Sequence, residues 1–145
     1  MPRIRERVTI AAPQERVWTA VHEDLDETPR WARYVRRAGL LDGDRPGPGR
    51  RVRYELNLPG DWSLTLRPTE WDRPRRCAGT FTDGPIAGTW SYTYAERNGQ
   101  TELDYEMDLR MGGLLGLAGG LLRSRYEEAV REGLRLLKAY LEEGG

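Results

Sequence analysis

The sequence lacks the features that mark a secreted or membrane-spanning protein. Its one cysteine, Cys77, rules out a disulfide within the chain and gives no sign of an oxidising compartment. The first ten residues, MPRIRERVTI, contain no apolar stretch of the kind found in a signal peptide. The longest apolar run, residues 111–122, includes five glycines and falls well short of the roughly 20 residues that a membrane-spanning helix needs. We therefore expect a soluble, cytoplasmic protein with no transmembrane segment.

The chain also has neither an excess of charge of one sign nor a set of metal ligands. Basic and acidic residues number 23 each, so the formal net charge is zero. Two arginine clusters, at residues 3–7 and 50–53, are balanced by acids and indicate a solvated surface, because nucleic-acid binders show a basic excess. One histidine, His22, and one cysteine are too few for a zinc site. We predict no nucleic-acid partner, no metal and no cofactor.

What the sequence does contain is a series of strands with alternating apolar and polar residues. Its 145 residues fit a single domain spanning residues 1–145. The pattern predicts one strand, two helices, six strands joined by short turns, and a long helix. The predicted strands cover residues 4–10, 35–41, 52–58, 62–66, 77–81, 90–94 and 103–109, and the helices start at Pro13, near residue 27 and near residue 120. Short turns predict antiparallel neighbours.

Two hairpins can be aligned from the sequence. Asn98-Gly99 is typical of a two-residue turn, and acids at 102, 104, 106 and 108 alternate with apolar residues on the return strand, which puts them on the solvated face. The predicted pairs are Trp90–Met107, Tyr92–Tyr105 and Tyr94–Leu103. Across the turn at residues 59–61, the predicted pairs are Leu56–Leu64 and Tyr54–Leu66. Both alignments place apolar residues on one face of the sheet.

The last helix carries an apolar stripe. It consists of Leu122, Tyr126, Ala129, Val130, Gly133, Leu137 and Tyr140, which recur every three or four residues. At about 1.5 Å per residue, a helix over residues 120–142 is about 33 Å long and can lie across a whole sheet. A sheet of this size twists and curls. A curled sheet gripped by one long helix leaves a hollow between them.

Six segments, in this order, resemble the START-like SRPBCC superfamily, which is also known from the birch-pollen allergen and has a helix-grip fold. They are VTIAAPQERVW (8–18), PRW (29–31), GRRVRY (49–54), EWDRPRR (70–76), GTWSY (88–92) and TELDY (101–105). Within the superfamily the chain is most similar to the bacterial polyketide cyclase/dehydrase and lipid-transport family. The resemblance implies an α+β fold in which a curved seven-stranded antiparallel sheet wraps around the C-terminal helix and encloses a cavity. It also implies a hydrophobic ligand, but it brings no shared catalytic motif.

The residues predicted to face the hollow are the candidate ligand-binding set. They are Tyr54, Leu56, Leu64, Leu66, Phe81, Trp90, Tyr92, Tyr105, Met107 and Tyr126. An apolar bowl with several phenol groups suits a small-molecule pocket, although a solid core would use the same residues. A glycine-rich segment before the last helix is predicted to be soft, because glycine disfavours helix. Its glycines, proposed as a gate for the ligand or a contact for a membrane or partner, are Gly112, Gly113, Gly116, Gly119 and Gly120.

Catalytic candidates are few. Glu6 lies in the apolar phase of the first strand and could act as a base if buried, or reach solvent at the strand end. One of Arg36 and Arg37 must point inward if its strand is regular. Tyr92 is a further candidate, whereas Cys77 is expected to be a small buried residue and not the nucleophile of a pair with His22.

Three functions are compatible with these patterns. The first is binding, and possibly transport, of a hydrophobic or aromatic small molecule such as a lipid or polyketide. The second is a polyketide cyclase, aromatase or dehydratase that uses pocket tyrosines with an acid or arginine. The third is a protein-partner module of the stress-response kind. The sequence leaves open whether the chain is an enzyme and whether it is a monomer or a dimer.

Overall fold

A computed structural model of the chain describes residues 3–57, 62–83, 86–111 and 119–143. The elements follow in the order β1 Arg3–Ile10, α1 Gln14–Trp18, a π-helical turn η1 Thr19–Glu23, a 3-10 turn η2 Leu25–Glu27, α2 Thr28–Trp31, β2 Val35–Leu40, β3 Val52–Leu56, β4 Ser63–Asp72, β5 Arg76–Thr82, β6 Ile86–Arg97, β7 Gln100–Met111 and α4 Gly119–Glu142. This order confirms the predicted strand–helix–helix–six-strand–helix arrangement.

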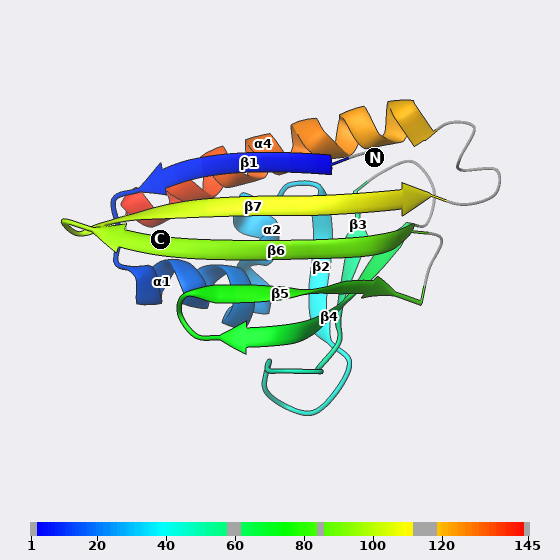
Figure 1. Cartoon of the computed structure of the whole chain (residues 1–145), viewed down its shortest axis with the longest axis horizontal. Coiled ribbons are helices and arrows are strands. Elements are labelled where there is room, and N and C mark those ends of the chain that lie inside the picture. The colour runs from blue at the N-terminus through cyan, green and yellow to red at the C-terminus, as the bar shows by residue number, and fades with distance from the viewer. Residues whose placement is uncertain (1–2, 58–61, 84–85, 112–118, 144–145) are drawn as a thin grey trace.

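The strands form one antiparallel sheet of seven strands in the order β1-β7-β6-β5-β4-β3-β2. Figure 1 shows the curved sheet with α4 running alongside β1 and with α1 and α2 on the same side of the sheet. The predicted helix-grip fold is therefore confirmed. The buried side chains of the sheet, the short helices and α4 form one hydrophobic cluster between these layers.

The β6–β7 hairpin has the predicted register. Tyr92 lies opposite Tyr105, and the pairs on either side are also as expected. Asn98 and Gly99 have φ values of 54° and 78°, which is the backbone conformation that a two-residue hairpin turn requires and that these two residue types tolerate.

The predicted β3–β4 register is wrong by two residues. Tyr54 pairs with Leu64, and Val52 pairs with Leu66. The apolar phase is nevertheless as expected, because a two-residue shift keeps each side chain on the same face of the sheet. Alternation alone therefore could not distinguish the two registers, and most of the turn, residues 58–61, lies outside the described residues.

Neither Arg36 nor Arg37 points inward, which corrects the expectation from a regular strand. The pairing of β2 with β3 shifts between Val35 and Arg37. This bulge adds one residue, so Val35 and Ala38 are both buried while the two arginines between them are exposed. Both guanidinium groups contact Glu55 instead, at 3.2 Å and 3.8 Å.

α4 packs against the hydrophobic core through Val130, Leu134, Leu137 and Leu141, and Leu137 is completely buried. The predicted stripe contained Val130 and Leu137 but missed the other two leucines; Tyr126 and Tyr140 are only half-buried. Polar contacts also fix the C-terminal half of α4 to the β1 region. Lys138 donates to the Thr9 carbonyl at 3.0 Å, and the Glu142 carboxylate accepts from the Ala11 amide at 2.8 Å.

The outer face of the sheet is polar. Asp104 of β7 bonds to both Arg5 and Arg7 of β1 at 3.0 Å, and Arg5 also contacts Glu106. The arginine cluster of the first strand is thus balanced by the acidic strand, as predicted. Over the described ranges, no three histidine, cysteine or acidic side chains are grouped so that they could hold a metal ion. No helix in the described part of the chain is long and apolar enough to cross a membrane.

Candidate functional site

Five tyrosines converge inside the fold and form what we call the tyrosine cluster. They are Tyr34 after α2, Tyr54 of β3, Tyr92 of β6, Tyr105 of β7 and Tyr126 of α4. The rings of Tyr92 and Tyr105 are 4.7 Å apart, and those of Tyr34 and Tyr126 are 5.4 Å apart. The Tyr105 hydroxyl donates to the Met107 sulfur at 3.2 Å. The inner face therefore offers several phenol groups within an apolar wall.

The cluster is uncharged. Burial, and then the neighbouring phenols, raise the pKa of Tyr34, Tyr92, Tyr105 and Tyr126 well above the usual range of a phenol, and burial also raises the pKa of Tyr54. Among the described residues, the other buried side chains with a hydroxyl or imidazole group are Tyr94, His22 and three threonines. Such an interior can hydrogen-bond to neutral oxygen atoms, but it holds no buried charge in its described part to pair with an ion.

Next to the cluster lies a small cavity, which we call the His22 pocket. It is bounded by η1, by the loop before β3 and by the inner face of the sheet, and its volume is about 30 Å³. Its polar lining consists of His22, Tyr54, Tyr92 and Cys77, with Arg50 on the side of the loop. Since one water molecule occupies roughly 10–15 Å³ in the same measure, the pocket has room for about two waters.

His22 is held among aromatic rings. Its ring lies 4.5 Å from Trp18 and 4.9 Å from Tyr92, and Nε2 is 2.6 Å from the Tyr94 hydroxyl. Desolvation in this setting lowers the pKa of His22 from 6.5 to about 3, so the imidazole is neutral at physiological pH. From the sequence, His22 was a candidate only as a metal ligand or as a base for Cys77. Its i,i+4 spacing from Trp18 is a signal for a shared helix face, whereas nothing in the sequence points to Tyr94, which is 72 residues away in the chain.

A charged clamp fixes the π-helical turn that carries His22. Arg73, in the turn between β4 and β5, bonds to Glu23 at 2.7 Å and to Glu15 at 2.6 Å. The Trp18 indole also donates to Glu23, at 3.1 Å. These hydrogen bonds, that of Arg73 above all, lower the pKa of Glu23. The clamp thereby ties α1 and the π-helical turn to the turn between β4 and β5, which positions the imidazole over the pocket.

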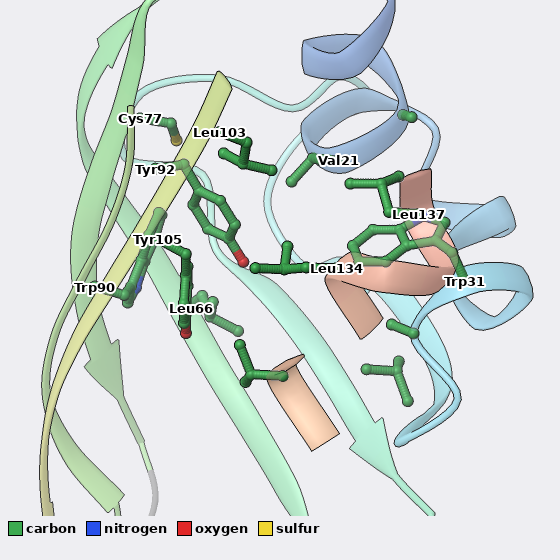
Figure 2. Close-up of a cluster of buried hydrophobic side chains, with 14 of the residues drawn as sticks. Val21, Trp31, Leu66, Cys77, Trp90, Tyr92, Leu103, Tyr105, Leu134 and Leu137 are labelled. Atoms are coloured by element: carbon green, nitrogen blue, oxygen red, sulfur yellow. The ribbon is translucent and has the colours of Figure 1, made fainter. Parts of the chain in front are cut away.

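All ten predicted ligand-binding residues lie on the inner side of the fold. Nine are buried, and Tyr126 is half-buried. Figure 2 shows Tyr92 projecting from the sheet toward Leu134 of α4, with Leu66, Trp90 and Tyr105 nearby. Four of the ten line the His22 pocket: Tyr54, Leu66, Trp90 and Tyr92. The other six, which are not part of that lining, are Leu56, Leu64, Phe81, Tyr105, Met107 and Tyr126.

The remaining predicted site residues lie apart from the His22 pocket or outside the described residues. Glu6 is 17% exposed and accepts two hydrogen bonds of 3.1 Å from Arg131 of α4, at the boundary between β1 and the helix. Burial raises the pKa of the Cys77 thiol to about 12, which keeps it protonated at neutral pH and fits a small buried residue. Gly119 and Gly120 begin α4, whereas Gly112, Gly113 and Gly116 lie outside the described residues.

Comparison with known proteins places this geometry in a family. Residues 1–142 match the family model described as polyketide cyclase/dehydrase and lipid transport. No curated protein sequence matches the chain significantly.

Solved structures with the same fold span nearly the whole chain. TTHA0849 from Thermus thermophilus is 20% identical, with 99% of this chain and 100% of the other covered and a TM-score of 0.78. A START superfamily protein from Mycobacterium smegmatis is 14% identical, with 97% of both chains covered and the same TM-score. The di-domain ARO/CYC BexL from the BE-7585A biosynthetic pathway is 18% identical, with 98% of this chain but 47% of the other covered and a TM-score of 0.73.

Proposed function

Because this chain belongs to the polyketide cyclase/dehydrase and lipid-transport family, as its sequence predicted, we propose that it binds an uncharged apolar or aromatic small molecule, such as a lipid or polyketide, on the inner face of its sheet. The observation that carries the proposal is the tyrosine cluster beside the His22 pocket. A pocket that combines apolar walls with a few converging polar groups is the usual form of a small-molecule site. The neutral phenols suit a ligand with hydroxyl or carbonyl oxygens and no charge.

The size of the His22 pocket sets a condition on binding. A cavity of about 30 Å³ is far smaller than the roughly 300–1,000 Å³ of pockets that enclose drug-sized ligands. A bound aromatic molecule must therefore displace side chains of the pocket wall. We expect binding to be accompanied by a rearrangement around the loop side of the pocket, where Pro46, Gly47 and Arg50 contribute to the lining.

Binding is favoured over catalysis by the protonation states of the interior groups. A general acid or base works best when its pKa lies near the operating pH. In the described interior, the pKa of His22 is about 3, and burial raises the pKa of the Cys77 thiol to about 12 and those of the clustered phenols above their usual range. The similarity to an ARO/CYC protein keeps cyclisation as the second candidate, but no described interior group is tuned to move a proton at neutral pH.

A titration with 2-acetylnaphthalene tests the proposal. We expect saturable binding, with amide chemical-shift changes in β3–β6 and in α4. Replacing Tyr92 by Phe removes one hydroxyl from the cluster and should weaken binding about fivefold, the effect of one neutral hydrogen bond. Tyr140→Phe is the matched control, because this tyrosine of α4 bonds to Glu27 outside the cluster. The absence of saturable binding to the folded wild-type protein would refute the proposal.

A further inference from the structure

We propose that His22 is a ligand-binding residue that donates a hydrogen bond from Nδ1 to a carbonyl oxygen of the bound molecule, and that Tyr94 positions it. The inference rests on the proposed function and names the recognised chemical group. His22 is the histidine that lines the pocket, and Tyr94 lies behind it. The ligand class is therefore an apolar or aromatic ketone, aldehyde or ester.

The hydrogen bond to Tyr94 determines which nitrogen is available. A neutral imidazole has one donor and one acceptor nitrogen. The buried Tyr94 hydroxyl lies 2.6 Å from Nε2, and a buried O–H group needs an acceptor. If the hydroxyl donates to Nε2, the proton of the ring is on Nδ1. His22 then keeps a single donor for a second partner, and a carbonyl oxygen is the complementary group.

The local structure is built to hold this ring in place. His22 lies in the π-helical turn Thr19–Glu23, and such turns occur frequently at functional sites because they redirect one side chain of a helix. The ring of His22 packs edge-on against Tyr92 at 4.9 Å and also contacts Trp71 at 6.1 Å. The clamp of Arg73 on Glu23 fixes the end of the turn. The imidazole is thus held rigidly, which lowers the entropy cost of binding.

The hydrogen bond to Tyr94 accounts for only one nitrogen of the imidazole. His22 is 8% exposed, and its ring is surrounded by aromatic side chains. Burial of a polar ring is costly unless its nitrogens are hydrogen-bonded, and the low pKa of His22 reflects that desolvation. A phenylalanine would make the same ring contacts but would leave the buried Tyr94 hydroxyl without this partner. That hydrogen bond uses one ring nitrogen and leaves the other available to a ligand. Recognition of a polar atom in the pocket gives the second nitrogen a use.

Two ligands of nearly the same shape test the proposal. 2-Acetylnaphthalene and 2-ethylnaphthalene differ chiefly in the carbonyl oxygen, so the ratio of their dissociation constants measures recognition of that oxygen. For the wild-type protein we expect the ketone to bind about 25-fold more tightly, about fivefold from His22 and about fivefold from the Tyr92 hydroxyl. In His22→Phe the ratio should fall to about fivefold, which is the share of Tyr92. In Tyr94→Phe the ratio should fall partway, because the tautomer is no longer fixed.

A measurement on the wild-type protein avoids any dependence on the folding of the variants. His22 is the only histidine, so a long-range 1H–15N spectrum of the imidazole shows a single ring. We expect the Nδ1–H tautomer, and a shift of Nδ1 when 2-acetylnaphthalene is added but not when 2-ethylnaphthalene is added.

The outcomes separate the two proposals. Binding of both compounds with equal affinity, an unchanged ratio in His22→Phe, or a ring spectrum that does not respond to the ketone would overturn the role of His22 while leaving the binding function intact. Failure of both compounds to bind would overturn the binding function itself.

Discussion

Acidification from pH 7 to pH 5 should destabilise this protein through one residue, His22. The imidazole is buried as the neutral form, with its pKa lowered by desolvation from 6.5 to about 3. The unfolded chain therefore binds a proton at pH 5, whereas the folded chain does not. A state that binds more protons is favoured as the pH falls, so the stability contributed by neutral His22 is complete above pH 6.5 and is lost progressively down to pH 3.

The size of the effect follows from the two pKa values of His22. Between them, each pH unit is worth about 1.4 kcal/mol. Because titration of the unfolded chain is only partial near its own pKa of 6.5, the loss between pH 7 and pH 5 is about 2 kcal/mol. This is a large part of the roughly 5–15 kcal/mol that stabilises a typical domain. A buried imidazole whose pKa is the same in the folded and the unfolded chain would cause no such loss.

Urea unfolding at pH 7 and pH 5, followed by tryptophan fluorescence, measures the difference. Asp104 and Glu142, whose carboxylates have lowered pKa values, titrate below this window, and the chain has no other histidine. The control is His22→Gln, which cannot titrate and should show less than about 0.5 kcal/mol of change between the two pH values. Equal unfolding free energies of the wild-type protein at both pH values, or a His22 resonance that titrates near pH 6.5, would refute the reasoning.

Two further substitutions test the packing and the polar contacts of the sheet. Gly79→Ala should lower the free energy of unfolding by about 3 kcal/mol in chemical denaturation. A Cβ there would lie 2.1 Å from a backbone oxygen of β4 and 2.7 Å from the Trp90 ring. The control is Gly39→Ala, which should change the free energy of unfolding little, because a Cβ at Gly39 has nothing within 4 Å. Glu6→Gln should cost less than about 1 kcal/mol and leave the dissociation constant of 2-acetylnaphthalene unchanged, because Glu6 pairs with Arg131 at the helix boundary; a large loss of affinity would instead place Glu6 in the site.

The parts of the fold that could be predicted from the sequence are those in which local and tertiary preferences agree. The hairpin of β6 and β7 combines strict alternation with Asn98-Gly99, so the turn fixes the register that the pattern leaves open. The acids of β7 face the arginines of β1 across the sheet, as their phase indicated. The family resemblance supplied the remaining step, from seven strands and a long helix to a helix-grip fold.

The parts that could not be predicted are those for which two arrangements fit the sequence pattern equally well. A two-residue shift of β3 against β4 keeps every side chain on its face, so alternation cannot detect it. A regular strand would turn one of Arg36 and Arg37 inward, but the bulge in the backbone leaves both side chains exposed. The contact line of α4 through Leu134 was missed, because both leucines and tyrosines recur at helical spacing and the sequence does not show which edge of the stripe meets the sheet.

Prediction of the candidate site from the sequence is limited in the same way as prediction of the fold. Nine of the ten predicted ligand-binding residues are buried, because alternation identifies the inner face of a sheet. Alternation does not show how much of that face is filled by side chains, and the described pocket is small. Nor does it show Tyr34, which follows a short helix and reaches the cluster through Tyr126.

Stability and the proposed ligand recognition depend on different parts of α4. Its C-terminal half is packed through Leu134, Leu137 and Leu141 and is hydrogen-bonded to the β1 region, whereas Tyr126, its residue in the tyrosine cluster, lies before this segment. The π-helical turn that carries His22 is likewise fixed from outside the pocket, by Arg73. The polar groups that we propose to face a ligand are thus held by contacts outside the tyrosine cluster and the His22 pocket. We therefore expect substitutions of a few inner residues to change the affinity for a ligand while the same contacts maintain the fold.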